Sequence, residues 1–297
     1  HNDAHVVESI LKSDIDVRNR LNIIVFDYGL DDLGIPAQLS VLHIAMSCAS
    51  VSIVKMLLES GANPYINDKY GVDSLMCACT LGRVKNVKFW LSKFQDWDIH
   101  RGNAINGSTA LHCAIYFGRN KMKTVQALLE NSQASLDVLN HGGASVLCNA
   151  VNSVDSNVDV IRYLLSKGLK FGVNHRRQSQ TVKWKAIYGI ARGLSRVKIM
   201  SSGLLRSLAW ESGSTPIHYA VRRGDVEVVE LLMEYSADPF IKNDLGRDAL
   251  SYCEAFPEIK RAIKRIKREG KHTQQHENKK LVSSNNFTLQ RRLSTAT

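Results

Sequence analysis

The sequence predicts an all-α fold, a curved solenoid of stacked helix pairs joined by β-hairpin turns. The first observation is a phrase, Gly213 to Ala220, that returns in degraded form along the chain. The second is its spacing, because successive copies lie 33 to 36 residues apart. A period in this range is typical of solenoids of small units, which mostly bind rather than catalyse. Counted from His218, the equivalent positions are His43, Met76, His112, Cys148, Trp184, His218 and Ser251.

The clearest unit runs from Gly213 to Asn243 and predicts two short helices. Thr215-Pro216 indicates a helix start, because Thr is a good N-cap and Pro suits the first turn. Gly224-Asp225 separates two apolar patterns of helical period. Asn and Gly after the second pattern favour a turn into the next unit.

Thr215 to Ala220 reads T-P-I-H-Y-A and resembles the ankyrin repeat, whose phrase at this place is T-P-L-H-x-A. Ser40 to Ala45 and Thr109 to Ala114 follow the same pattern. The resemblance covers residues 38–256. It implies that the recurring histidines are structural anchors that hydrogen-bond a turn to its neighbour. These anchors are His43, His112 and His218.

The pattern breaks down around Trp184. Thr181 and Ala186 keep the expected spacing from this residue, but no double-Leu phrase follows in register. Glycines within residues 175–212 also disfavour an ideal helix pair. Two alternatives remain for this segment, a degenerate repeat or an insertion whose length preserves the phase.

The two ends depart from the repeat. Residues 1–17 predict the second helix of a truncated repeat, and residues 18–37 a long connection. Because the chain begins with His1 inside a repeat, we expect a piece of a longer protein. Residues 257–269 predict a basic amphipathic capping helix, and the polar residues 270–297 a disordered tail.

The formal charge of +11 is concentrated in two segments. Residues 170–210 contain nine Lys or Arg and no acidic residue, and residues 257–297 contain eleven basic and three acidic residues. The charge favours an acidic partner surface. We do not expect nucleic-acid binding, because no zinc-finger, helix-turn-helix or stacking pattern accompanies the charge.

The basic helix has several interpretations. As an amphipathic helix, residues 259–271 could be a target for calmodulin, an anionic membrane surface or a nuclear import receptor. We favour a capping role, because Ile259, Ile263 and Ile266 fall on one face and are needed to cover the last repeat. We therefore do not expect binding to an anionic membrane.

Nothing in the sequence predicts catalysis or a cofactor. No phosphate-binding loop, nucleophile elbow or metalloprotease helix occurs. The six cysteines form no C-x-x-C pair, and several occupy repeat positions where small buried residues pack. We expect a non-enzymatic protein without metal or disulfides, in the reducing cytoplasm, with the nucleus as the alternative.

The resemblance implies that a partner protein contacts the hairpin tips and the concave face formed by the first helices. Exposed aromatic and Arg side chains on such a face are frequent binding hot spots. For Tyr116 and Phe117 packing between helices is an equal alternative. The tip candidates are Asp68, Lys69, Tyr70, Asn106, His141 and Lys242, and the concave candidates are Tyr116, Phe117, Arg222 and Arg223.

Two R-R-x-S motifs are candidates for phosphorylation. Arg176-Arg177-Gln178-Ser179 and Arg291-Arg292-Leu293-Ser294 resemble the consensus of basophilic kinases. Both are expected in a loop or tail that a kinase can reach, and Ser294 is preferred over Ser179. Phosphate there would place negative charge inside a basic segment.

The leading hypothesis is an interaction scaffold built of ankyrin repeats, with a partner of unknown identity. The alternative is a regulatory or targeting region of a larger enzyme, such as a protein kinase, or of an ion channel. A third hypothesis is membrane-surface association through residues 259–271.

Overall fold

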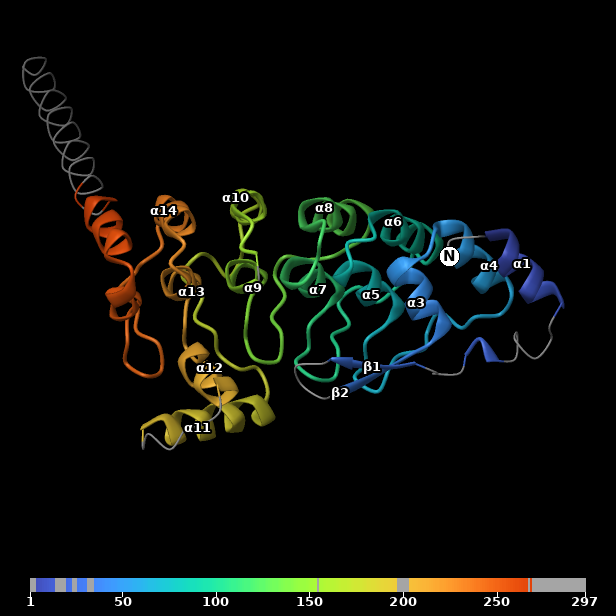
Figure 1. Cartoon of the computed structure of the whole chain (residues 1–297). Helices are drawn as coiled ribbons and strands as arrows, with labels where there is room; N and C mark the ends of the chain where they lie inside the picture. Colours follow the sequence, from blue (N-terminus) through green and yellow to red (C-terminus); the bar gives the residue numbers. More distant parts are fainter. Residues whose placement is uncertain are drawn as a thin grey trace, which may run out of the picture.

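The computed structural model describes residues 4–13, 20–22, 26–30, 35–153, 155–196, 203–266 and 268. Its helices form two parallel rows with loops projecting from one side (Figure 1). The elements of the repeats are α3 (Val41–Cys48), α4 (Val51–Glu59), α5 (Ser74–Thr80), α6 (Val84–Lys93), α7 (Ala110–Tyr116), α8 (Lys121–Asn131), α9 (Val146–Asn152), α10 (Val158–Ser166), α13 (Pro216–Arg223) and α14 (Val226–Glu234).

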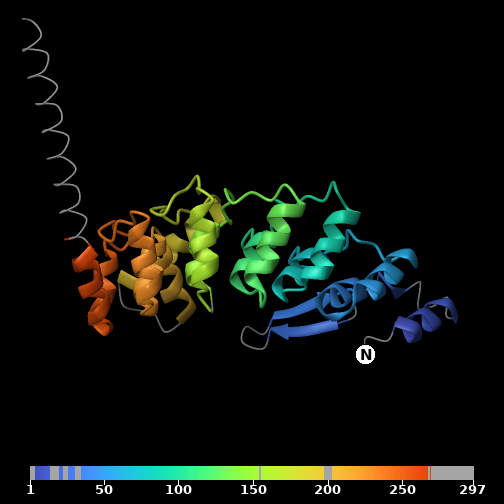
Figure 2. The same ribbon diagram turned by 90° about the horizontal axis from the view of Figure 1, so that it is seen from above.

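Each repeat contributes one helix to each row. The first helices contact one another in the order α3, α5, α7, α9 and α13, and the second helices in the order α4, α6, α8, α10 and α14. The units follow one another along the stack in sequence order (Figure 2). The predicted solenoid of stacked helix pairs is confirmed.

The first helices begin where the sequence supplies an N-cap. The side chain of Ser40 accepts a hydrogen bond from the backbone of His43, and Asp73 and Ser145 cap α5 and α9 in the same way. Such a side chain satisfies a backbone N–H that the helix leaves unpaired. These caps fix the first residue of each helix and therefore the register of the stack.

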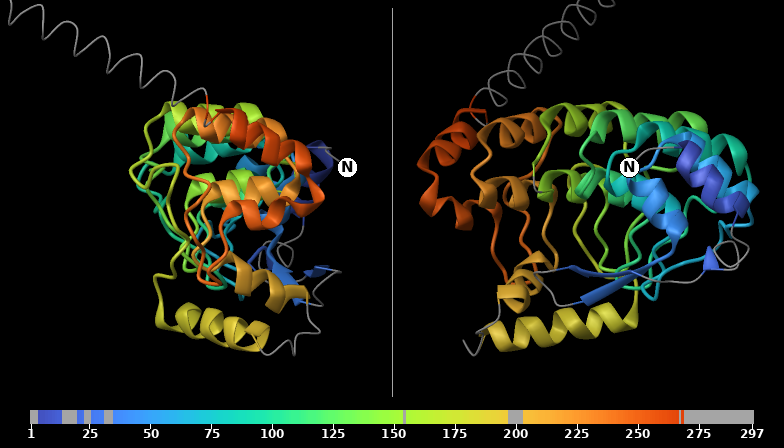
Figure 3. Two further views of the ribbon diagram at one scale, coloured as in Figure 1. Left: turned by 90° about the vertical axis from the view of Figure 1, so that its left-hand side faces the viewer. Right: turned by 45° about the vertical axis from the view of Figure 1, so that its right-hand side comes forward.

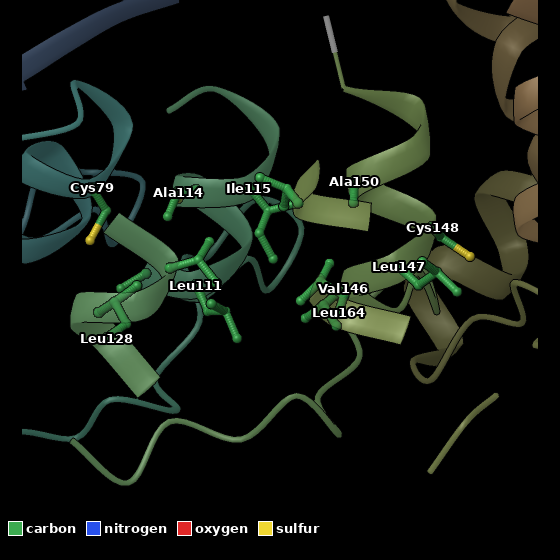
Figure 4. Packing of buried hydrophobic residues seen from close by; sticks show 14 of the residues in the cluster. Cys79, Leu111, Ala114, Ile115, Leu128, Val146, Leu147, Cys148, Ala150 and Leu164 are labelled. Carbon is green, nitrogen blue, oxygen red and sulfur yellow. The ribbon is translucent and has the colours of Figure 1, made fainter. Parts of the chain in front are cut away.

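The core is continuous from unit to unit. Figure 4 shows Leu111 and Ile115 of α7 on one side and Val146 of α9 and Leu164 of α10 on the other, with Leu147 further along the stack beside Cys148. All six are at most 2% exposed. Since each side chain is buried partly by the next unit, the hydrophobic stabilisation comes from stacking.

Residues 175–212 do not form a stacked helix pair. They contain α11 (Val182–Arg196) and α12 (Gly203–Glu211), which contact each other. Helix α9 packs directly on α13, and α10 on α14. In Figure 1 both α11 and α12 lie below the two rows, on the side of the loops. The segment is therefore an insertion between two neighbouring repeats, and Trp184 does not occupy a repeat anchor.

The N-terminal region holds a hairpin that the sequence did not predict. Strands β1 (Phe26–Leu30) and β2 (Ile35–Leu39) pair antiparallel within and just after the expected connection, with Phe26 opposite Leu39. Helix α1 (Ala4–Ser13) contacts α4, which belongs to the row of second helices.

The C-terminal unit consists of the 3-10 helix η1 (Ala249–Ala255), which contacts α13, and a helix at 257–266. Ile259 and Ile263 are buried, whereas Lys260 and Lys264 are exposed. The apolar face of this helix thus packs on the stack. The tail predicted at 270–297 lies outside the described residues.

Within the described ranges, none of the helices has the length and apolar character that crossing a membrane requires.

Candidate protein-interaction surface

A narrow hairpin closed by two backbone hydrogen bonds precedes each of α5, α7, α9 and η1. The Asn140 N–H donates to the Ala144 carbonyl at 3.1 Å, and the Gly143 N–H donates to the Asn140 carbonyl at 2.8 Å. Gly143 has φ +79°, which suits glycine. The same pair of bonds recurs at Asp68 with Gly71 and Val72, at Asn103 with Gly107 and Ser108, and at Asn243 with Gly246 and Arg247.

The first residue of these hairpins is Asp or Asn because its side chain organises the turn. A carboxylate oxygen of Asp68 accepts the N–H groups of Tyr70 at 2.9 Å and Val72 at 2.7 Å. Asp68 is only 7% exposed. Its expected exposure at a tip is therefore wrong, since the turn occupies its carboxylate.

The other tip candidates differ in how far their side chains are exposed to solvent. Lys69 and Lys242 are exposed, and the Lys69 ammonium lies 5.1 Å from the centre of the Tyr70 ring. Asn106 accepts the Ser108 N–H through its side chain and is partly buried. His141 is also partly buried, with its ring against Gly107. Among these candidates, the exposed positive charge thus comes from the two lysines.

Backbone bonds also join neighbouring tips. The Ala104 N–H donates to the Tyr70 carbonyl, and the His141 N–H donates to the Asn106 carbonyl, both at 2.6 Å. The insertion continues this series, because the Gln180 N–H donates to the His141 carbonyl at 3.2 Å. The tips therefore form one connected edge.

The insertion replaces one hairpin tip. The Arg177 N–H donates to the Ser214 carbonyl at 2.9 Å, and the Gly213 N–H donates to the Arg177 carbonyl at 2.8 Å. These are the two bonds that close every other hairpin, with Arg177 in the Asp or Asn position. Residues 178–213 lie between the two arms, where the first hairpin has only residues 69–71. We call the Arg177–Ser214 pair the neck of the insertion.

A buried ion pair holds the insertion against the stack. Arg177 lies 2.7 Å from the carboxylate of Glu211 in α12, and its guanidinium donates to the Tyr219 hydroxyl of α13 at 3.1 Å. The guanidinium also lies 5.8 Å from the ring centre of Tyr188 in α11, whose hydroxyl donates to the Gly142 carbonyl. Burial opposes the charge of Arg177, but Tyr219 and Glu211 raise its pKa further above the usual range. The guanidinium stays charged and joins four chain segments.

Trp210 of α12 packs on the first-helix row. Its ring centre is 4.9 Å from that of Tyr219, and the Arg222 guanidinium lies 4.1 Å over the indole. Asp244, at the next hairpin tip, accepts from Arg176 at 2.9 Å and from Arg192 of α11 at 2.7 Å. The insertion is thereby fixed to the repeats on both sides.

The concave candidates lie near this contact. Tyr116 is half-buried, and its ring is 4.7 Å from that of Phe117, which is 59% exposed. Burial raises the pKa of Tyr116, with smaller effects of Glu211, Arg177 and Arg223 that place these charges near its hydroxyl. Arg222 and Arg223 are exposed, although Arg222 uses one face on Trp210. Phe117 and the two arginines thus remain accessible to a partner.

Two of the recurring histidines form buried hydrogen bonds between the start of a first helix and the hairpin that follows. In the first unit the Nδ1 atom of His43 accepts from the Ser40 hydroxyl at 2.7 Å, and Nε2–H donates to the Val72 carbonyl at 3.1 Å. His218 makes the equivalent bonds to Thr215 and the Arg247 carbonyl. Each His therefore fastens its own helix start to the next hairpin.

His112 makes the Thr109 contact, but among the described residues its Nε2 has no hydrogen-bond partner. Burial lowers the pKa of His112 to about 4. Burial is also the main cause of the lowered pKa values of His43 and His218. All three anchors are consequently neutral at pH 7. No cluster of three metal-ligating side chains occurs in the part of the chain that the structure describes.

Family models confirm the repeat. A model described as ankyrin repeats in three copies matches residues 1–101 and 87–175, and an ankyrin repeat model matches residues 212–244. Together they cover more than half of the chain. The chain belongs to the ankyrin repeat family. The matched ranges stop at 175 and resume at 212, which are the two ends of the insertion.

Relatives of this ankyrin repeat chain occur in larger proteins. It is 24% identical over 220 residues to human transient receptor potential cation channel subfamily A member 1, covering 68% of this chain and 18% of the channel. It is 26% identical over 221 residues to palmitoyltransferase AKR1 of Lachancea kluyveri, covering 72% of this chain and 29% of the relative. The ankyrin repeat domain of Bcl-3, an IkappaB family member, shares the fold with a TM-score of 0.50 and 23% identity, over 83% of this chain and 91% of that domain.

Ser179 is not accessible to a kinase in the folded chain, contrary to the expectation from the sequence. Ser179 is 8% exposed, and its hydroxyl donates to the His141 and Thr181 carbonyls, both at 3.0 Å. The expected access of a kinase to this loop is therefore wrong for the folded chain, because the serine closes the entry to α11. Ser294 lies outside the described residues and stays a prediction.

The residues that sequence reasoning missed are those that attach the insertion. They are Arg177 as an ion-pair partner, Tyr188, Trp210, Glu211, Tyr219 and Asp244. One local signal was present. Asp or Asn stands three residues before Gly71, Gly143 and Gly246 and four residues before Gly107, whereas Ala209 and Trp210 stand at these two places before Gly213. The absence of this turn residue indicates that the hairpin is interrupted.

Proposed function

We propose that the chain is a non-enzymatic protein-interaction scaffold whose basic surface binds an acidic region of a partner protein. Ankyrin repeats are a protein-interaction module and generally not catalytic. The finer proposal concerns which surface is used. We assign it to the edge of connected hairpin tips, the insertion and the adjoining concave residues Phe117, Arg222 and Arg223.

The main support for this proposal is the charge and the position of the insertion. Residues 170–210 have nine basic and no acidic side chains, and the helices α11 and α12 within this range lie on the side of the hairpin tips (Figure 1). Arg176, Arg177 and Arg192 are engaged with carboxylates of the chain itself. Lys183 and Lys185 of α11 are exposed, as are Lys69 and Lys242 at the tips. Such a field favours encounter with an acidic surface and discriminates against basic ones.

The test is a pull-down with the full chain and with charge-neutralised variants. Lys183→Gln/Lys185→Gln and Lys69→Gln/Lys242→Gln should each reduce capture of the partners that the wild-type chain retains. Lys85→Gln/Lys88→Gln on α6 is the matched control, since both lysines are exposed on the row of second helices. An unchanged set of partners in the first two variants would refute the role of the basic surface. Phe117→Glu, tested alongside, reports on the concave residues separately.

A second candidate is a regulatory or targeting region of a larger enzyme or ion channel. It is supported by the lengths of the relatives, because the chain spans 18% of the channel and 29% of the palmitoyltransferase. Reading the full open reading frame tests it. Channel, transferase or kinase sequence continuous with this chain supports the candidate, and stop codons closely flanking the repeats would remove it.

A further inference from the structure

Helix α11 of the insertion exposes apolar side chains on its outer face. Val182 is 83% exposed, the most exposed large hydrophobic residue in the described part of the chain, and Ile190 is 61% exposed. In both views of Figure 3, α11 runs along the lower edge of the molecule, away from the helix rows. Leaving such side chains in water is unfavourable, which suggests that something covers them.

The middle of the same face consists of small residues. Ala186, Gly189 and Gly193 are exposed, and a Cβ atom added at either glycine would meet no atom within 4 Å. Glycine inside a helix costs about 1 kcal/mol relative to alanine. Among the described residues, no contact explains these glycines. A flat strip of this kind allows the axis of a second helix to approach closely.

Basic side chains border this strip on both sides. At 100° per residue, Val182, Ala186, Gly189 and Gly193 share one face, with Lys183 towards one side and Lys185 towards the other. Both lysines are exposed. A helix with acidic residues beside its apolar stripe would place carboxylates against both lysines.

The opposite side of α11 is fixed to the molecule. Tyr188 and Ala191 are 2% and 0% exposed, and Arg192 binds Asp244 and the Ser212 hydroxyl, both at 2.7 Å. Since these contacts fix the rotation of the helix, its apolar strip faces outwards. A partner would therefore meet a preformed surface, which lowers the entropy cost of binding.

We propose that the α11 face, defined by Val182, Ala186, Gly189, Ile190 and Gly193, docks an amphipathic α-helix of a partner protein whose apolar stripe is flanked by Asp or Glu. This inference rests on the scaffold function proposed above and names the surface and the partner chemistry. A second copy of the chain is disfavoured, because two α11 faces would bring lysines against lysines. A membrane is disfavoured because interfacial helices bury bulky Leu, Phe or Trp side chains rather than glycines.

The test uses two designed fluorescent helical peptides with the same Leu and Ala stripe. One carries Glu beside the stripe, and its twin carries Lys at those positions. By fluorescence anisotropy the full chain should bind the Glu peptide saturably and the Lys twin at least about tenfold more weakly. Added salt should weaken the Glu complex, since the flanking charges are exposed.

Variants locate the site. Ile190→Glu and Gly189→Leu should each weaken binding of the Glu peptide by at least about tenfold, because one removes an apolar anchor and the other fills the strip. Tyr235→Glu, which changes a 40% exposed residue at the end of α14 in the row of second helices, is the matched control and should bind as the wild-type chain does. Circular dichroism of every variant checks that the stack is folded.

Several results would overturn the docking proposal. The first two are failure of the Glu peptide to bind and equal binding of the Glu and Lys peptides. The third is an unchanged affinity of both α11 variants for the Glu peptide. The others are self-association of the chain that Ile190→Glu abolishes, and preferential binding of the chain to phosphatidylserine vesicles. None of them refutes the scaffold function, which fails separately if the lysine variants capture the same partners as the wild-type chain.

Discussion

The Nη1 atom of Arg177 lies 2.7 Å from a carboxylate oxygen of Glu211, with 11% of the Arg and 14% of the Glu side chain exposed. The two residues come from opposite ends of the insertion. Their contact draws α12 back to the neck, so that the inserted helices are fixed to the repeats rather than tethered by two loose strands.

Breaking this pair on one side should be costly. Arg177→Met leaves Glu211 buried without its partner, and we expect the free energy of unfolding to fall by about 3–5 kcal/mol. The double variant Arg177→Met/Glu211→Leu should lose less, because no charge is stranded. Urea denaturation at pH 7 of these two variants and of Glu211→Leu alone measures the three free-energy changes. A double variant that loses the sum of the two single changes would show that the residues act independently.

Acid should weaken the fold through the histidine anchors. The pKa of His112 is lowered to about 4 by burial, whereas in the unfolded chain it is near 6.5. Because the unfolded state then binds more protons, stability is full above pH 6.5 and falls as the pH decreases towards 4. His112 alone contributes up to about 3 kcal/mol to this loss. Urea midpoints measured from pH 7 to pH 4 test it, and His112→Gln should flatten the curve.

The exposed glycines of α11 should tolerate alanine. Gly193→Ala lowers the backbone entropy of the unfolded chain and creates no clash, so we expect a gain of about 0.5–1 kcal/mol. Gly143→Ala is the contrasting control, because its φ of +79° disfavours alanine and the added Cβ would collide with the backbone of Gln178. Thermal melts of the two variants should shift in opposite directions. A destabilised Gly193→Ala would mean that α11 packs against something in the isolated chain.

The stack should survive loss of the insertion. Since α9 already packs on α13, replacing residues 177–213 by the tip sequence of Asn140 to Gly143 restores the hairpin of a normal repeat. We expect a folded chain that is less stable by about 3–5 kcal/mol, mainly through loss of the Trp210 contact with Tyr219. Hydrogen exchange should still show protected amides in α9 and α13. Rapid exchange throughout α13 would mean that the insertion is required for stacking.

The local features of this fold could be predicted, and the long-range ones could not. Ser40, Thr109 and Thr215 begin helices through contacts three residues away, so the sequence alone predicts these caps. Arg177 and Glu211 are far apart in sequence, and only the folded insertion brings them together. Spacing misled at Trp184, because the insertion is nearly as long as one repeat and keeps the later anchors in phase.

Asp68 shows a different limit of prediction from the sequence. Acidic residues in turns are usually exposed, which favoured a partner-binding role for it. The narrow hairpin instead needs an acceptor for two backbone N–H groups, and the carboxylate supplies it from a buried position. The lysine next to it, which has no such task in the turn, is exposed as predicted.

The neck joins the backbones of Arg177 and Ser214 as in an ordinary hairpin. The backbone geometry of the neighbouring repeats therefore depends on the two ends of the inserted segment and not on its length. Chains whose termini lie about 5 Å apart, the separation of paired strands, could therefore be exchanged at this place without shifting the helices. This makes the hairpin an attachment point for engineering. A reporter domain grafted there would project from the edge proposed to face a partner and could signal when that edge is covered.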